Sequence, residues 1–214
     1  MTTQAKRPQV NWSRRSEHRP AEIAAAALRL FAERGFAATK LEDVAREAGI
    51  SKGTLYLYYA TKEDLFRAVV QQKLLPNLER LEAAAAAHTG SIVSLFRQLA
   101  DPVADLMERD IAVIPKLILS EAGNFPEIAK FYAEEVVGRG KRLFDRILQR
   151  GIESGEFRAG NASDLLPIFF GPVLMLLLWR HSIGRHSGEK FDSRTVLHTH
   201  IDMFLRGVAA DGAA

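Results

Sequence analysis

Apolar residues recur every three or four positions along most of the chain, which is the spacing of one face of an α-helix. In residues 21–34, for example, Ile23, Leu30 and Phe31 share one face, and Gly35 can end the helix. Hardly any segment alternates apolar and polar residues as a strand does. The pattern therefore predicts an all-α fold of about nine helices, over residues 21–34, 41–48, 52–59, 61–87, 91–109, 115–121, 126–155, 165–179 and 196–208.

Short helices with clear boundary signals follow the first one. Thr39 with Glu42 three residues later has the form of a capping box, and Gly49 can end the helix that it opens. Ser51 is a candidate N-cap for the next short helix, and Thr61 is one for the longer helix that follows. These signals place three compact helices within the first third of the chain.

The predicted helices 41–48 and 52–59 together have the form of a helix-turn-helix, at about residues 40–59. Ala45 is small where the two helices would cross, and Gly49 suits a left-handed turn between them. Apolar residues that would lock one helix across the other are Val44, Ala48, Ile50 and Leu55. The alternative is an ordinary helical hairpin within a bundle.

The surface chemistry of residues 39–62 favours DNA as the partner of this unit. Lysine can donate to guanine, glycine permits close approach, threonine offers a hydroxyl and a methyl group, and tyrosine can reach bases or phosphates. Helix N-termini suit phosphate oxygens. The candidate DNA contacts are Thr39, Lys40, Ser51, Lys52, Gly53, Thr54, Tyr56, Tyr58, Thr61 and Lys62. Alternatively, the hydroxyl residues serve only as caps and the two tyrosines pack locally.

Charge is distributed unevenly along the 214 residues. The 29 Lys and Arg exceed the 26 Asp and Glu by three, but residues 1–60 carry a net +4 and residues 61–214 a net −1. A basic N-terminal segment on a nearly neutral body is typical of a protein that binds a polyanion. Residues 1–18 are expected to form a basic flexible arm that contacts DNA or, alternatively, a solvated tail.

Several classes of protein are disfavoured by what the sequence lacks. The absence of cysteine excludes disulfides, thiolate metal sites and a cysteine nucleophile, and fits a cytoplasmic location. The first twenty residues lack the apolar core of a secretory signal. The apolar run 165–179 is shorter than the roughly 18 to 20 residues of a membrane span and contains two prolines, so we expect a buried helix and no membrane.

We expect no enzyme, no catalytic residue, no metal site and no cofactor. The sequence has no P-loop, no G-x-S-x-G and no H-E-x-x-H. His198 and His200 would point about 200° apart on a helix, although a metal site built with His181 and His186 stays open as an alternative. The rival hypotheses are a small helical enzyme and a basic DNA-binding protein without sequence preference.

Residues 30–70 resemble the DNA-binding domain of TetR/AcrR-family transcriptional regulators. The matching pieces are F-x-x-x-G-[FY]-x-x-T at 31–39, A-x-x-A-G-[IV]-S at 45–51 and K-G-x-[LIF]-Y-x-[YH]-[FY]-x-x-K-[ED]-x-L at 52–65, with Tyr59 where phenylalanine is commoner. The resemblance implies a bacterial homodimer that binds a palindromic double-stranded operator, usually as a repressor. A small-molecule effector in the C-terminal domain would then move the connecting helix and release the DNA.

The expected organisation is an arm at 1–18, a DNA-binding domain at 19–65, and a ligand-binding and dimerisation domain at 66–214. Helices at about 164–180 and 194–208 are expected to pair with their mates in a homodimer, the alternative being a monomeric core. We expect a largely apolar effector in a pocket with aromatic walls, although each candidate could also be plain core. These pocket candidates are Phe96, Leu99, Val103, Met107, Leu117, Phe131 and Phe169.

Overall fold

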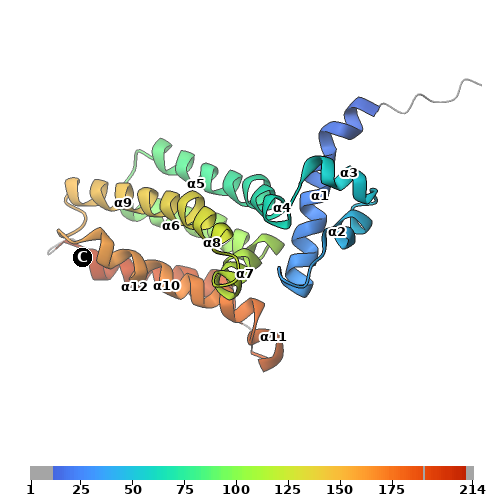
Figure 1. Cartoon of the computed structure of the whole chain (residues 1–214). Coiled ribbons are helices and arrows are strands. Elements are labelled where there is room, and N and C mark those ends of the chain that lie inside the picture. Colours follow the sequence, from blue (N-terminus) through green and yellow to red (C-terminus); the bar gives the residue numbers. More distant parts are fainter. Residues whose placement is uncertain (1–11, 190, 211–214) are drawn as a thin grey trace, which may run out of the picture.

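A computed structural model describes residues 12–189 and 191–210, and all of its regular elements are helical (Figure 1). The N-terminal elements are α1 (Trp12–Arg34), α2 (Leu41–Glu47), α3 (Lys52–Tyr58), α4 (Lys62–Val69), the π-helical η1 (Val70–Leu74) and α5 (Leu75–Ala87). The others are α6 (Ile92–Met107), the 3-10 helix η2 (Asp110–Val113), α7 (Ile114–Glu121), α8 (Pro126–Tyr132), the π-helical η3 (Ala133–Val137), α9 (Gly138–Glu153), α10 (Ala162–His181), α11 (Gly184–Ser187) and α12 (Ser193–Val208).

The predicted all-α fold is confirmed. Within the described ranges no strand forms, and the one extended pairing is an isolated bridge between Phe157 and Ala209. The first helix begins at Trp12 rather than at residue 21, so residues 12–18, predicted as part of a flexible arm, have a helical backbone. The rest of that predicted arm, residues 1–11, lies outside the described residues.

Glycine and hydroxyl residues end and begin the short N-terminal helices largely as predicted. Gly35 and Gly49 have φ angles of 83° and 65°, in the left-handed region that favours glycine. The Ser51 side chain accepts from the backbone of Thr54, and Thr61 forms a full capping box with Asp64. Local sequence therefore determines where α3 and α4 begin.

Two hydrophobic clusters fill the interior. The first joins α1–α4, which form a head at one end of the molecule, to η2, α7 and α8 of the body (Figure 1). Its centre is aromatic, with Phe36 packed against Phe31, Phe66 and Phe125 at ring-centroid distances of 5.3, 5.6 and 4.7 Å. The second cluster lies between α5, α6, α9, α10 and α12, which run alongside one another in the body (Figure 1). The head thus shares its core with the near end of the body.

Two continuous helices contain π-helical turns. η1 connects α4 of the head to α5 of the body, and η3 connects α8 to α9. The two continuous helices are in contact near these turns, because η3 packs against α5. A π turn holds one more residue than an α turn and is uncommon in helices. η1 therefore lies at the junction of head and body, and η3 lies within the body, between α8 and α9.

A matched pair of glycines in α9 provides a test of this packing. A Cβ added to Gly151 would lie 2.2 Å from the buried ring of Phe157, whereas one added to Gly140 meets nothing within 4 Å. Gly151→Ala should therefore lower the free energy of unfolding by about 1–3 kcal/mol. Gly140→Ala should leave it unchanged or raise it by up to about 1 kcal/mol, since alanine favours a helix interior. Urea titration followed by circular dichroism measures both; equal effects would contradict the packing.

Candidate nucleic-acid interface and effector cavity

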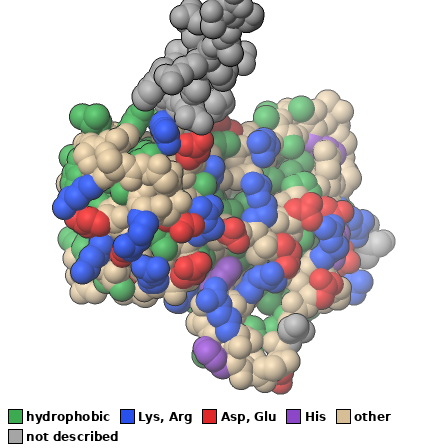
Figure 2. Space-filling view, turned by 90° about the vertical axis from the view of Figure 1, so that its right-hand side faces the viewer, with side chains coloured by type: hydrophobic (Ala, Val, Ile, Leu, Met, Phe, Trp, Pro, Cys, Tyr) green, Lys and Arg blue, Asp and Glu red, His purple; other side chains and the backbone are tan. Residues whose placement is uncertain are grey.

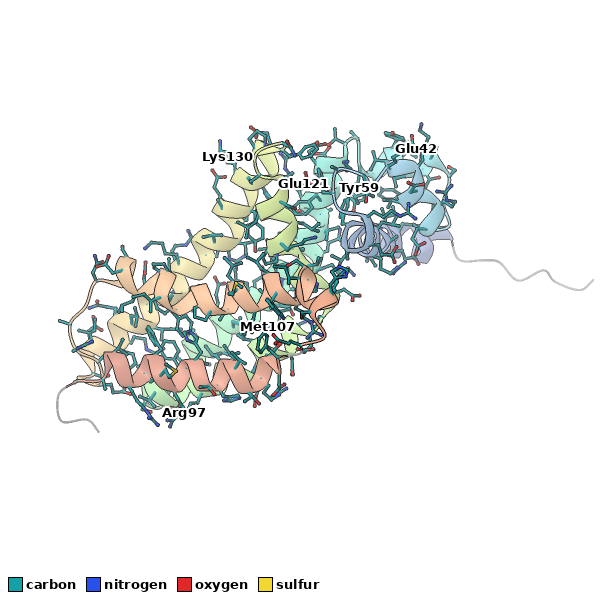
Figure 3. All side chains as sticks on the ribbon, turned by 90° about the horizontal axis from the view of Figure 1, so that it is seen from below. Glu42, Tyr59, Arg97, Met107, Glu121 and Lys130 are labelled. Carbon is teal, nitrogen blue, oxygen red and sulfur yellow. The ribbon has the colours of Figure 1, made fainter. Side chains whose placement is uncertain are left out.

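The head presents α3 on its surface, held there by α2. Val44, Ala45 and Leu55 are buried where the two short helices cross, and Gly49 makes the turn between them. α3 has only seven residues, too few to be stable alone, so its position depends on this packing. In Figure 3, Glu42 of α2 lies on the part of the head far from the body. The arrangement is that of a helix-turn-helix with its second helix facing outward.

The outward side of α3 is polar at its edges and apolar along its middle. Lys52 and Gly53 are exposed at its start, and Tyr56 and Tyr58 are 41% and 37% exposed. Leu57 is 86% exposed and was not among the predicted contact residues. Leu55 is fully buried, as the sequence predicted.

Lys52 is engaged with a neighbouring acid. Its Nζ lies 2.6 Å from Oε1 of Glu42 and 5.6 Å from the ring centroid of Tyr56. The hydrogen bond raises the pKa of Lys52 and lowers that of Glu42. An exposed ion pair of this kind contributes little to stability, so Lys52 can exchange Glu42 for another anion at small cost.

Ser51, Thr54 and Thr61 have local hydrogen bonds that leave them at the surface of the head. Ser51 Oγ lies 2.8 Å from Thr54 Oγ1 and accepts from its backbone N–H, and Thr61 Oγ1 accepts from Asp64 N. Ser51 and Thr61 are exposed, and Thr54 is half-buried. The sequence analysis left open whether these residues serve as caps, contact DNA or do both, and their positions are compatible with both roles.

Two of the predicted contact residues face inward, and Thr39 is the first. Its side chain is 1% exposed, and its hydroxyl donates to the carbonyls of Gly35 and Leu30 at 2.7 and 3.3 Å. The predicted Thr39 cap is also wrong, because Lys40 is the N-cap of α2 and makes no side-chain cap bond. The chain turns back after Gly35 and needs an internal donor, and Thr39 supplies it.

Lys62 is the second correction. Its Nζ donates to the carbonyls of Phe36 and Ala37 at 2.7 and 2.9 Å, and it lies 4.6 Å from the ring centroid of Phe36. Burial lowers the pKa of Lys62, against the opposite influence of Glu63 and Glu121. In this structure the ammonium group therefore closes the turn between α1 and α2.

Basic and acidic side chains are interleaved over the head. Figure 2, which faces this end of the molecule, shows Lys and Arg beside Asp and Glu and between apolar side chains. Ion pairs such as Arg29–Glu47, at 3.0 Å, and Arg34–Asp43, at 3.3 Å, account for part of this pattern. Lys40 is exposed beside α2. The face is thus suited to a defined set of contacts more than to general attraction of a polyanion.

A separate apolar cavity of about 140 Å³ lies in the second cluster. Four of the predicted pocket residues line it, namely Phe96, Leu99, Val103 and Phe169. Its other lining residues come from α5, α6, α9, α10 and α12 and are also apolar: Leu78, Leu81, Ala100, Gly140, Leu143, Phe144, Ile147, Phe170, Val173, Leu197 and Ile201. The cavity can therefore accept only an apolar group.

The other three predicted pocket residues lie elsewhere. Met107 is buried in the second cluster but does not line the cavity. Leu117 and Phe131 belong to the first cluster, on the side of the body next to the head. Helical periodicity identifies apolar faces but does not tell which of two cores a face joins.

A larger cavity, of about 640 Å³, opens near the end of α10 and has mixed charged walls. Burial, with Arg185 and Arg180 nearby, lowers the pKa of His181 to about 4, so this lining histidine is neutral at pH 7. His198 and His200 point to different partners, Asp101 Oδ1 at 2.9 Å and the carbonyl of Phe169 at 2.7 Å. Among the described residues, no group of three His, Asp or Glu side chains is placed to hold a metal ion.

α10 exposes apolar residues along one side. It has 20 residues and is the one described helix that is long and apolar enough to cross a membrane by length and composition alone. Its other side packs on the second cluster through residues such as Phe169, Val173 and Leu177. The exposed side includes Ile168 and Met175, at 60% and 56% exposure.

Comparison with known proteins identifies both parts of the chain. Residues 23–69 match the family described as bacterial regulatory proteins, tetR family, and residues 86–189 match the tetracyclin repressor-like C-terminal domain. The chain is 30% identical over 220 residues to the HTH-type transcriptional repressor KstR2 of Mycobacterium tuberculosis, covering 95% of this chain and 96% of that protein. It is 31% identical over 156 residues to the HTH-type transcriptional regulator YfiR of Bacillus subtilis, covering 72% and 75%.

A solved structure shares the fold along most of the chain. The transcriptional regulator FadR of Bacillus subtilis, in complex with stearoyl-CoA, superposes with a TM-score of 0.70 at 22% identity. The superposition covers 88% of this chain and 98% of that one. The likeness therefore includes the head and the body together.

The inward position of Lys62 predicts a structural role that a matched lysine lacks. Lys62→Met should lower the free energy of unfolding by about 1–3 kcal/mol, because the carbonyls of Phe36 and Ala37 lose their donor. Lys40→Met, at an exposed position, should change it by less than about 0.5 kcal/mol. Thermal and urea unfolding measure both variants. A Lys62→Met protein as stable as the wild type would show that this ammonium group is dispensable.

Proposed function

The chain belongs to the TetR family of bacterial transcriptional regulators, and from this we propose that it is a homodimeric repressor released from a palindromic operator by a small apolar effector. One observation carries the proposal: an outward-facing helix, α3, and an apolar cavity lie in different hydrophobic clusters of one chain. The first suits DNA and the second suits a ligand. On this proposal the chain acts by binding and not by catalysis, in the bacterial cytoplasm and at the nucleoid when it holds DNA.

We assign the DNA contacts to the outward side of the head. α3 would enter the major groove while the N-terminus of α2 faces the backbone. Lys52 would leave Glu42 for a base or phosphate, and the exposed tyrosines would contact backbone or base edges. The proposed contacts are Lys40, Ser51, Lys52, Gly53, Thr54, Tyr56, Tyr58 and Thr61.

The exposed apolar side of α10 supports a homodimer whose interface is formed by α10 and α12. Ile168, Met175 and Met203 are each more than half exposed, and α10 packs beside α12. Solvent contact over such a surface is unfavourable, and a second copy can cover it symmetrically. The proposed interface therefore includes helices at about 164–180 and 194–208. Two heads would then present two recognition helices to the two halves of a palindrome.

The size of the apolar cavity suggests how a ligand acts. Sites for drug-sized ligands usually measure about 300–1,000 Å³, and this cavity measures about 140 Å³. Phe96, Phe144 and Phe169 pack closely around it, with ring-centroid distances of 5.4 and 5.0 Å to Phe169. A larger ligand must displace these rings, and with them α6, α9 or α10. We propose that this displacement changes the spacing of the two heads.

The recognition helix provides the first test. Lys52→Ala and Tyr56→Ala should each weaken operator binding by about 1–3 kcal/mol with the fold intact. Fluorescence anisotropy at fixed salt measures the affinity, on an operator found by footprinting the DNA beside the gene. Lys130→Ala, an exposed lysine of α8 in the body (Figure 3), is the control and should bind as the wild type does.

Two results would contradict this assignment. Unchanged affinity in both α3 variants would remove α3 as the recognition helix. Equal binding of operator and random DNA, with only a steep dependence on salt, would instead favour a basic protein without sequence preference.

The dimer interface is tested by adding charge to the apolar side. The double variant Met175→Asp, Met203→Asp should sediment as a monomer, because burying two carboxylates per copy is strongly unfavourable. Leu119→Asp is the matched control, an exposed apolar residue of α7 that should leave the mass unchanged. A double variant with the wild-type mass would place the interface elsewhere.

The effector cavity is tested with acyl-CoAs of increasing chain length, since FadR of Bacillus subtilis was solved with stearoyl-CoA. Each added CH₂ that enters the cavity should lower the concentration needed for operator release about four-fold, at about 0.8 kcal/mol. Val103→Phe fills the cavity and should raise that concentration at least about ten-fold without weakening operator binding. Val137→Phe, at an exposed position, is the control. Release by CoA alone, without dependence on chain length, would contradict an apolar site.

A further inference from the structure

Leu57 of α3 has an unusual position for a large apolar side chain. It is 86% exposed, whereas the next most exposed large apolar side chain among the described residues, Met203, is 70% exposed. Met203 belongs to the proposed dimer interface, so a partner copy would cover it. Leu57 lies outside that interface, on α3, where the proposed partner is DNA.

Helix geometry places Leu57 at the outermost line of α3. Successive residues of an α-helix are about 100° apart, so Gly53 and Leu57 lie within about 20° of the direction opposite the buried Leu55. Lys52 and Tyr56 lie on one side of this line, and Thr54 and Tyr58 lie on the other. When α3 enters a groove, the line through Gly53 and Leu57 is the part that reaches deepest.

Gly53 allows that approach to be close. A Cβ added there would meet only Ser51 Oγ, at 3.8 Å, so the backbone of the first turn is open to its surroundings. Leu57 lies one turn further along the same line. A base pair can thus approach the backbone at Gly53 while the next base pair meets the leucine side chain.

The chemistry of Leu57 limits what it can recognise. It has no polar atom on its side chain, so it cannot read the hydrogen-bonding groups of a base. In the major groove the one apolar group on a base edge is the 5-methyl group of thymine. We propose that Leu57 is a specificity-determining residue that packs on a thymine methyl group in each half of the operator. This inference rests on the proposed DNA-binding function.

Deoxyuridine provides a direct test, because its base, uracil, differs from thymine only by the missing 5-methyl group. The full-length protein is used to select its preferred duplex from random DNA at fixed salt. Each thymine of the selected duplex is then replaced by deoxyuridine, alone and together with its symmetry mate, and affinity is measured by fluorescence anisotropy. Wild type should lose about four-fold in affinity at one thymine per half-site, and about fifteen-fold when both are replaced, as expected for one buried methyl group each.

Variants at position 57 link this loss to the leucine. Leu57→Ala should bind the thymine duplex more weakly and bind the thymine and deoxyuridine duplexes equally. Leu57→Met retains an apolar side chain and should retain the discrimination. Leu119→Ala, an exposed leucine of α7, is the control and should match the wild type throughout.

Two outcomes overturn the inference, and they differ from failure of the proposed function. If wild type binds every deoxyuridine duplex as well as the selected one, or if Leu57→Ala still discriminates, then Leu57 does not read a methyl group although the protein still binds its operator. If the selection yields no preferred sequence, the proposed function itself fails, and the role of Leu57 fails with it.

Discussion

The edge-to-face packing of Phe36 on Phe125 joins the head of this protein to its body. The two ring centroids are 4.7 Å apart, and the ammonium group of Lys62 lies over both rings, at 4.6 and 5.6 Å. Close to these rings, Glu121 accepts a hydrogen bond from the backbone of Ala37 at 3.4 Å (Figure 3). Because these contacts form part of one continuous cluster, the head cannot rotate freely, and the direction of α3 is determined by the body. A rigid movement of this part of the body would therefore carry α3 with it.

Much of the head could be predicted because its boundaries depend on local chemistry. Gly35 and Gly49 adopt left-handed backbone angles that other residues disfavour, and Ser51 and Thr61 accept hydrogen bonds from N–H groups three residues ahead. Such interactions involve near neighbours in the sequence, so residue type and spacing suffice to identify them. The family resemblance rests on the same segment.

The corrected positions depend on contacts between distant residues. Lys62 reaches carbonyls 25 and 26 residues earlier, and Thr39 turns inward because the chain folds back on α1. Phe96 and Phe131 were both predicted to line one pocket, yet they belong to different clusters. Sequence identifies an apolar face, but its partner is a property of the assembled helices.

The π turn η1 determines how the connection between head and body responds to a change in length. Val70–Leu74 holds a residue more than an α-helical path would use. Deleting one residue there would leave a continuous α-helix with nearly the same angle between α4 and α5, because the π turn accommodates the extra residue as a local bulge. Inserting a further residue, in contrast, would turn α4 by about 100° relative to α5 and disturb the packing of Phe36 on Phe125. The connection is consequently more tolerant of a deletion within η1 than of an insertion.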